Sequence, residues 1–136
     1  MVVMVVDGQG GGVGRALVAA LRAKLAAGHT IRALGTNSAA TAAMLRAGAD
    51  EAATGEHAIV HNAARADVIA GPIGIVLASS LLGELTPAMA AAIAGSDAQK
   101  VLLPMERCQT HVVGAAPLPL GEAVDRAAEL ILSLLS

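Results

Sequence analysis

The amino-acid sequence predicts an α/β protein with three layers: a central, mainly parallel sheet of five or six strands, with helices on both faces. Short apolar runs, several of them rich in β-branched residues, alternate along the chain with segments whose apolar residues recur at helical spacing. A glycine-rich turn joins the first such run to the first helical segment, as in many parallel-sheet proteins. The 136 residues contain no internal repeat or linker, so we predict a single domain over residues 1–136.

Each expected element follows from its apolar pattern and its boundary residues. Residues 2–6 are continuously apolar, which is typical of a central strand buried on both faces. Residues 13–27 place three leucines on one helical stripe, and Gly28 ends this helix. Residues 75–82 are ambiguous, and we favour a helix over a strand. The other expected strands are residues 29–34, a short one within 49–56, 66–71, 100–104 and a short sixth at 110–114; the other helices are 39–47, 56–65, 87–94 and 119–135.

The helix ends and the last helix allow more specific predictions. Thr36, Asn37 or Ser38 caps the second helix, and Thr86 followed by Pro87 begins the helix at residues 87–94. The last helix carries one apolar stripe that is expected to cover the sheet and two leucines outside it, which would serve a homodimer contact or deeper burial. The stripe is Val124, Ala128, Ile131 and Leu135, and the two leucines outside it that we consider for such a contact are Leu130 and Leu134.

Composition excludes several classes of partner. The net charge is −2 without a basic run, and the chain has no Phe, Tyr or Trp on which a base could stack, so we expect no nucleic-acid partner. The longest apolar stretch, residues 71–83, is too short to span a bilayer, so we expect no membrane partner. A single cysteine fits a reducing compartment, and we predict a cytoplasmic protein.

The stretch DGQGGGVGR, residues 7–15, predicts a phosphate site. Backbone amides at a helix N-terminus attract an anion, and glycines let a ligand approach the backbone. The spacing G-x-G-x-x-G does not fit, whereas Gly8, Gly12 and Gly14 give G-x-x-x-G-x-G and Gly8, Gly11 and Gly14 give G-x-x-G-x-x-G. The first spacing is similar to the coenzyme loop of short-chain dehydrogenases, and the second to atypical, often non-catalytic relatives of that superfamily. A purely structural tight turn is the alternative.

The same loop resembles the GGVGKT sequence of deviant Walker ATPases but lacks the residues that handle a γ-phosphate. Gln9 stands where the first glycine of that motif is needed, Arg15 replaces its lysine, and Ala16 replaces its Mg²⁺-binding hydroxyl. We therefore do not expect phosphoryl transfer.

The carboxyl ends of the other strands supply the rest of the expected crevice. The end of the second strand, at Thr36 and Asn37, has neither an acid for ribose hydroxyls nor an arginine for a 2′-phosphate. NAD, NADP or another nucleotide therefore remain alternatives, bound by a sensor, carrier or accessory protein. The residues expected to contact this ligand are Asp7, Gly8, Gln9, Gly10, Gly11, Gly12, Val13, Gly14, Arg15, Thr36, Asn37, Gly71, Pro72 and Ile73.

Catalysis is a second hypothesis. The chain contains no tyrosine, so the Tyr-x-x-x-Lys pair of short-chain dehydrogenases is absent. A small enzyme would act on a phosphorylated metabolite through Asp7, Glu106, Arg107 or Cys108. His57 and His61 have helical i, i+4 spacing beside Glu56, but no third ligand follows, and we expect no metal. A structural homodimer without ligand is the third hypothesis.

Five segments carry a resemblance to a known family over nearly the whole chain. They are DGQGGGVG (7–14), ALGTNSAATAAMLRAGA (33–49), ATGEHAIVHN (53–62), ADVIAGPIGIV (66–76) and LLPMERC (102–108). Together they resemble the bacterial family called domain of unknown function 3842. The resemblance implies a small cytoplasmic, Rossmann-like protein without an assigned reaction, and it carries over no catalytic residue.

Overall fold

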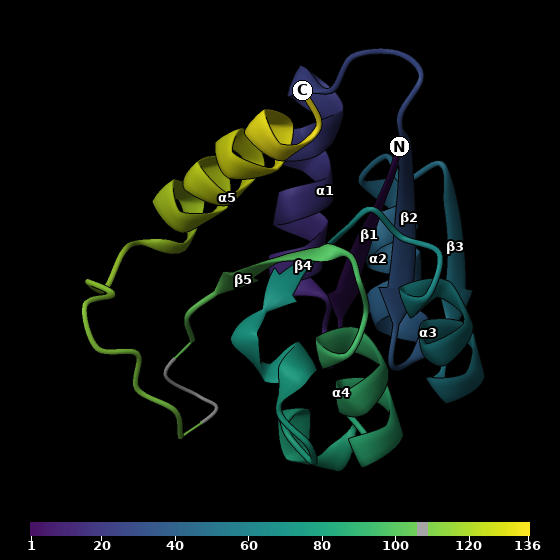
Figure 1. Cartoon of the computed structure of the whole chain (residues 1–136), viewed down its shortest axis with the longest axis vertical. Helices are drawn as coiled ribbons and strands as arrows, with labels where there is room; N and C mark the ends of the chain where they lie inside the picture. The colour runs from purple at the N-terminus through teal and green to yellow at the C-terminus, as the bar shows by residue number, and fades with distance from the viewer. Residues whose placement is uncertain (106–108) are drawn as a thin grey trace.

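The computed structural model describes residues 1–105 and 109–136 (Figure 1). Its centre is one five-stranded sheet in which every neighbouring pair of strands is parallel, in the order β3-β2-β1-β4-β5. This architecture confirms the predicted fold class. Residues 110–114, considered as a sixth strand, are not part of the sheet. The strands are β1 (Val2–Asp7), β2 (Thr30–Gly35), β3 (Glu51–Thr54), β4 (Val68–Pro72) and β5 (Gln99–Leu103).

Helices cover both faces of the sheet. Residues of α1, α2 and α5 pack into one hydrophobic cluster, whereas residues of α3 and α4 pack into a second cluster on the opposite face. Figure 1 shows α1 and α5 side by side. The helices are α1 (Gly12–Lys24), α2 (Ser38–Arg46), α3 (Glu56–Ala63), α4 (Pro87–Ala94) and α5 (Leu120–Leu134), with the short 3-10 helices η1 (Ile73–Val76) and η2 (Leu81–Gly83).

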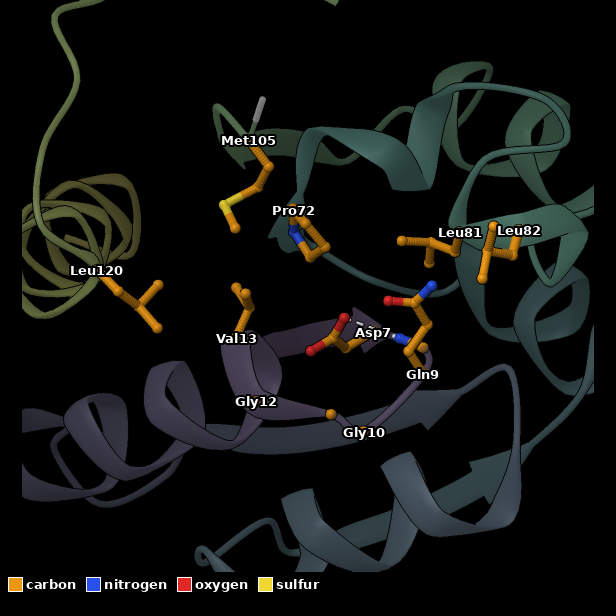
Figure 2. Close-up of a pocket in the computed structure, with 12 residues that line it drawn as sticks. Asp7, Gln9, Gly10, Gly12, Val13, Pro72, Leu81, Leu82, Met105 and Leu120 are labelled. Atoms are coloured by element: carbon orange, nitrogen blue, oxygen red, sulfur yellow. Dashed lines mark hydrogen bonds between the residues drawn. The ribbon is translucent and has the colours of Figure 1, made fainter. Parts of the chain in front are cut away.

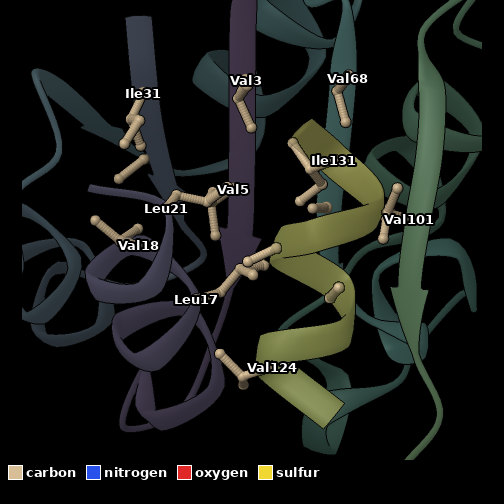
Figure 3. Packing of buried hydrophobic residues seen from close by; sticks show 14 of the residues in the cluster. Val3, Val5, Leu17, Val18, Leu21, Ile31, Val68, Val101, Val124 and Ile131 are labelled. Atoms are coloured by element: carbon tan, nitrogen blue, oxygen red, sulfur yellow. The ribbon is translucent and has the colours of Figure 1, made fainter. Parts of the chain in front are cut away.

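The apolar run of β1 explains how the two clusters are held together. Val3 and Val5 face the cluster that contains Leu17 and Ile131 (Figure 3), while the alternating residue Met4 belongs to the cluster on the other face. Successive side chains of a strand point to opposite faces, so a central strand needs an unbroken apolar sequence. The prediction of a doubly buried first strand is therefore confirmed.

The segment between β4 and α4 departs from the prediction. A helix over residues 75–82 was favoured, but η1 ends at Val76 and Leu77 is extended. Ser79, Leu81 and Leu82 have φ angles of 65°, 56° and 57°, which an α-helix cannot contain. The apolar composition was compatible with a helix, but the chain here instead turns sharply beside the glycine loop.

Helix ends mostly follow the sequence signals. Asn37 caps α2 by accepting a hydrogen bond from the amide of Ala40, and Thr86 caps α4 ahead of Pro87. The first helix ends at Lys24, earlier than predicted, and Gly28 lies in the following loop with φ 99°.

The last helix packs through the predicted stripe. Val124, Ala128 and Ile131 are buried and Leu135 packs partly buried against the same cluster. Leu130 and Leu134 remain exposed, which excludes their deeper burial within this chain.

Candidate functional site

A pocket of about 850 Å³ lies where β1 and β4 end (Figure 2). These neighbouring strands are where the order of the sheet reverses direction, because β2 and β3 lie to one side of them and β5 to the other. Open parallel sheets bind their ligands at such a position, beyond the carboxyl ends of the strands. The lining residues are Asp7, Gly8, Gln9, Gly10, Gly11, Gly12, Val13, Pro72, Leu81, Leu82, Met105 and Leu120.

Three glycines of the loop are required by their surroundings. A Cβ atom on Gly8 would lie 2.6 Å from the Thr36 hydroxyl, and one on Gly14 would lie 2.8 Å from Cβ of Asp7. Gly11 has φ 73° and lies against the backbone of Ala40. The sterically restricted positions are therefore 8, 11 and 14, which is the G-x-x-G-x-x-G spacing.

Gly10 and Gly12 have different surroundings. A Cβ atom at either position would meet no heavy atom within 4 Å, and both residues are exposed and line the pocket. Neither therefore needs to be glycine for the loop to fold. Their small size keeps the backbone accessible from the pocket.

Asp7 fastens the loop to the start of α1. Its side chain is buried, and its two carboxylate oxygens accept hydrogen bonds from the amides of Gly8, at 2.8 Å, and Gly14, at 2.7 Å. Burial raises the pKa of the Asp7 carboxyl above its ordinary value, against the opposing effect of these amide donors. Asp7 thus braces the loop and also contributes to the pocket wall.

The Val13 amide also hydrogen-bonds the Asp7 carboxyl, and together these bonds leave two amides of the loop available. The amide of Gln9 donates to Glu84, and the amide of Gly11 donates to the carbonyl of Gly8. Within residues 1–105 and 109–136, the amides of Gly10 and Gly12 have no hydrogen-bond partner. The open backbone donors of the loop are therefore these two amides and not the whole run of residues 8–14.

Glu84 joins the glycine loop to the end of β2. Its Oε1 accepts hydrogen bonds from the Gln9 amide at 2.9 Å, the Thr36 hydroxyl at 2.7 Å and the Asn37 side-chain amide at 2.8 Å. The Gln9 amide, followed by the Thr36 hydroxyl, holds the pKa of Glu84 below its ordinary value. Sequence reasoning missed Glu84, because no local pattern links a residue after β4 to Thr36, 48 positions earlier.

The rest of the pocket is apolar. Val13 and Pro72 lie beside Asp7, while Leu81, Leu82, Met105 and Leu120 surround them in Figure 2. Leu82 is 96% exposed although it is a large apolar residue. Of the residues that sequence reasoning did not assign to the site, Met105 lies at an expected strand end, but nothing in the sequence marks Leu81, Leu82 or Leu120.

Several predicted site residues do not line the pocket. Gly14 is buried beneath Met44, and the side chain of Arg15 is exposed. Gly71 is packed against the carbonyl of Val6, and Ile73 begins η1. Thr36 and Asn37 reach the loop through Glu84, and Asn37 also donates to the carbonyl of Gln9. Glu106, Arg107 and Cys108 lie outside the described residues.

His57 and His61 lie near each other on α3. The ring centroids of His57 and His61 are 6.2 Å apart. Within the described ranges, no group of three or more His, Cys, Asp and Glu side chains has the arrangement of a metal site. Within the same ranges, no helix has the length and hydropathy to cross a membrane.

The fold and the pocket at the ends of β1 and β4 define a Rossmann-like α/β domain. The chain belongs to the family described as Domain of unknown function (DUF3842), whose model matches residues 2–136. Curated proteins yield no significant match. Among solved structures, the chain is similar to the crystal structure of a dodecameric FMN-dependent UbiX-like decarboxylase from Escherichia coli O157:H7. The TM-score is 0.52 at 16% identity, over 99% of this chain and 94% of the other, which shows a shared fold.

Proposed function

We propose that the protein binds a nucleotide or dinucleotide in the 850 Å³ pocket and serves as a sensor, carrier or accessory protein. One observation carries the proposal: the amides of Gly10 and Gly12 lack partners in the described part of the chain and belong to glycines that leave the backbone open to the pocket. An unpaired amide at the start of a helix is a good partner for a phosphate oxygen, because the helix dipole adds to the hydrogen bond.

Charge restricts where the phosphate can lie. Asp7 and Glu84 are both carboxyl groups, and they already take the amides of Gly8, Gln9 and Gly14. A phosphate would be repelled from these positions and attracted to the Gly10 and Gly12 amides. Arg15 is an exposed residue, the fourth of α1, and its guanidinium can turn toward a phosphate bound at the start of the helix.

The apolar wall suits the ring of such a ligand. Pro72, Leu81 and Met105 offer flat or flexible apolar surface, and ligand pockets commonly combine such surface with a few well-placed polar groups. FMN carries a ring system, hydroxyls and a phosphate, and the structurally similar decarboxylase is described as FMN-dependent. FMN therefore belongs among the candidate ligands with NAD, NADP and other nucleotides.

Thermal unfolding with and without ligands tests this proposal. We expect at least one of NAD, NADP, FMN, ATP, GTP or a sugar phosphate to raise the melting temperature of the wild-type protein by mass action. Gly12→Asp should abolish the rise through charge repulsion, although an acidic residue in the first turn favours the helix itself. Gly12→Asn is the matched neutral control and should keep a reduced rise. Equal rises in melting temperature for both variants would mean that the phosphate does not bind at Gly12. Native mass spectrometry of protein fresh from cells would identify a ligand that co-purifies.

Acid–base catalysis on a phosphorylated metabolite is the second candidate function. Asp7 favours it, because a buried carboxyl with a raised pKa that also lines a pocket is a candidate proton donor or acceptor. Turnover of a sugar phosphate that Asp7→Asn abolishes would support this function. Loss of turnover in Cys108→Ala would instead assign the reaction to the thiol.

We also propose that the protein forms a homodimer through α5. A homodimer that binds no ligand is the alternative to the nucleotide-binding function. Leu130 is 51% exposed and Leu134 is 36% exposed, one helical turn apart. A melting temperature that ignores every compound in the panel would favour a purely structural dimer. The single cysteine favours the cytoplasm as the site of action.

A further inference from the structure

We propose that Glu84 is the residue that recognises the sugar of the ligand, accepting hydrogen bonds from the vicinal hydroxyls of an unphosphorylated nucleotide ribose. This inference rests on the proposed function and narrows its ligand class. It predicts that the protein binds nucleotides such as AMP or NAD and that it discriminates against nucleotides with a 2′-phosphate.

Glu84 lies beside the end of β2, where dinucleotide-binding folds place an acid that binds the ribose. In dinucleotide-binding folds, an acid at the carboxyl end of the second strand binds the ribose hydroxyls beside the glycine loop. The end of β2 carries no acid in this chain, since it continues into Thr36 and Asn37. Glu84 comes from the segment between β4 and α4, yet its Oε1 bonds both of these side chains. A carboxylate is therefore present in space at a position where the sequence lacks one.

Glu84 also lies close to the amides that are proposed to bind the phosphate. Glu84 also accepts the amide of Gln9, the residue immediately before Gly10. Its Oε1 lies 3.2 Å from the position that a Cβ atom on Gly8 would occupy. Glu84 is not itself a lining residue of the pocket, but it is hydrogen-bonded to Gln9, which lines the pocket next to Gly10. A ribose attached to a phosphate at the Gly10 and Gly12 amides would therefore approach this carboxylate past Gln9.

The Glu84 carboxylate can still accept hydrogen bonds from a ligand. Three donors fix Oε1, whereas Oε2 accepts no hydrogen bond in the described part of the chain, and the side chain is only partly buried. An ionised carboxylate only accepts hydrogen bonds, so it pairs with hydroxyl donors and repels a phosphate. The same three donors stabilise its ionised form at neutral pH.

Binding of three adenosine compounds tests the assignment. AMP, 2′-deoxy-AMP and adenosine 2′,5′-bisphosphate share a base and a 5′-phosphate and differ at the 2′ position. We expect the wild-type protein to bind AMP about tenfold to a hundredfold more tightly than either analogue, as is typical of losing a hydrogen bond to a charged group. Calorimetric titration measures all three affinities.

Substitution of Glu84 separates recognition from structure. The Oε1 of glutamine keeps an acceptor for Gln9, Thr36 and Asn37, so Glu84→Gln should stay folded and lose less stability than Glu84→Ala. We expect it to bind AMP more weakly and the bisphosphate more tightly, so that the preference between them falls at least tenfold. Glu129→Gln, an exposed change on α5, is the control and should leave all three affinities unchanged.

The outcomes distinguish this inference from the proposed function. If AMP binds, and Gly12→Asp abolishes its binding, but AMP and 2′-deoxy-AMP bind equally, Glu84 has a purely structural role and nucleotide binding stands. Binding of FMN without any adenosine compound would also overturn the assignment to ribose. If none of the phosphate compounds binds the wild-type protein, both proposals are wrong.

Discussion

Residues 8–14 contain five glycines with two different physical roles. Gly8 allows the loop to pack against Thr36 and the segment after β4, and Gly11 and Gly14 allow it to pack against α2, whereas Gly10 and Gly12 leave the pocket open. We expect Gly8→Ala and Gly14→Ala to lower the free energy of unfolding by about 1–3 kcal/mol through overpacking. Gly10→Ala and Gly12→Ala should change it by less than about 0.5 kcal/mol, or raise it slightly. Urea unfolding followed by circular dichroism measures all four, and equal losses would remove the distinction.

Asp7 gives the folded protein a characteristic dependence on pH. Its pKa in the folded protein lies above the ordinary 3.8, so the folded state holds this proton more tightly than the unfolded state. Its contribution to stability is therefore most favourable at low pH and declines as pH rises through the folded pKa. We expect the unfolding free energy of the wild type, minus that of Asp7→Asn, to increase as pH is lowered through that range. A difference that decreases instead would mean that the amides of Gly8 and Gly14 outweigh burial.

At the level of elements, the carboxylate of Glu84 ties residues 77–86 to the glycine loop and to the end of β2, while Leu85 of the same segment is buried in the core. The segment contains three non-glycine residues with positive φ, each of which has a conformational cost. Glu84→Ala would leave the donors on Gln9, Thr36 and Asn37 without their acceptor, and we expect a loss of about 1–3 kcal/mol. In Glu84→Ala, the amides of residues 77–86 should exchange faster than in the wild type, and this acceleration should be larger than for the amides of β1. Unchanged exchange there would mean that the apolar contacts of Leu81 and Leu85 hold the segment.

The contribution of Glu84 to stability depends on pH in the opposite sense to that of Asp7. The pKa of Glu84 is lowered from 4.5, so its stabilising contribution is present above that value and disappears as pH falls through the folded pKa. We expect the stability difference between wild type and Glu84→Gln to shrink on acidification. A difference that grows as pH falls would contradict the contacts assigned to this carboxylate.

Elements with a local signal were predictable from the sequence, and contacts between distant segments were not. The β1 strand, the cap at Thr86 and the buried stripe of α5 follow from periodicity and local chemistry. The helix expected at residues 75–82 was wrong, because its apolar composition carries no sign of the left-handed turns that the chain adopts there. Glu84 belongs to that segment, so the error in its conformation also concealed its contact with Thr36.

The whole molecule presents its last helix as a candidate contact between copies. If Leu130 and Leu134 form a homodimer, Leu130→Glu combined with Leu134→Glu should give a monomer, because two charges would be buried in an apolar contact. Leu45→Glu, at an exposed leucine of α2, is the control and should leave the mass unchanged. Sedimentation equilibrium measures both variants. A wild-type monomer, or a dimer that survives the double substitution, would contradict a contact through α5.

We propose that the open amides of Gly10 and Gly12 hold a nucleotide phosphate beside the apolar pocket. Amide NMR spectra of the ¹⁵N-labelled protein, titrated with AMP and separately with adenosine, test it most directly. We expect AMP to cause the largest chemical-shift changes at Gly10 and Gly12, and adenosine to cause smaller ones there. Unmoved resonances for these two glycines at saturating AMP, or equal changes with adenosine, would contradict the claim.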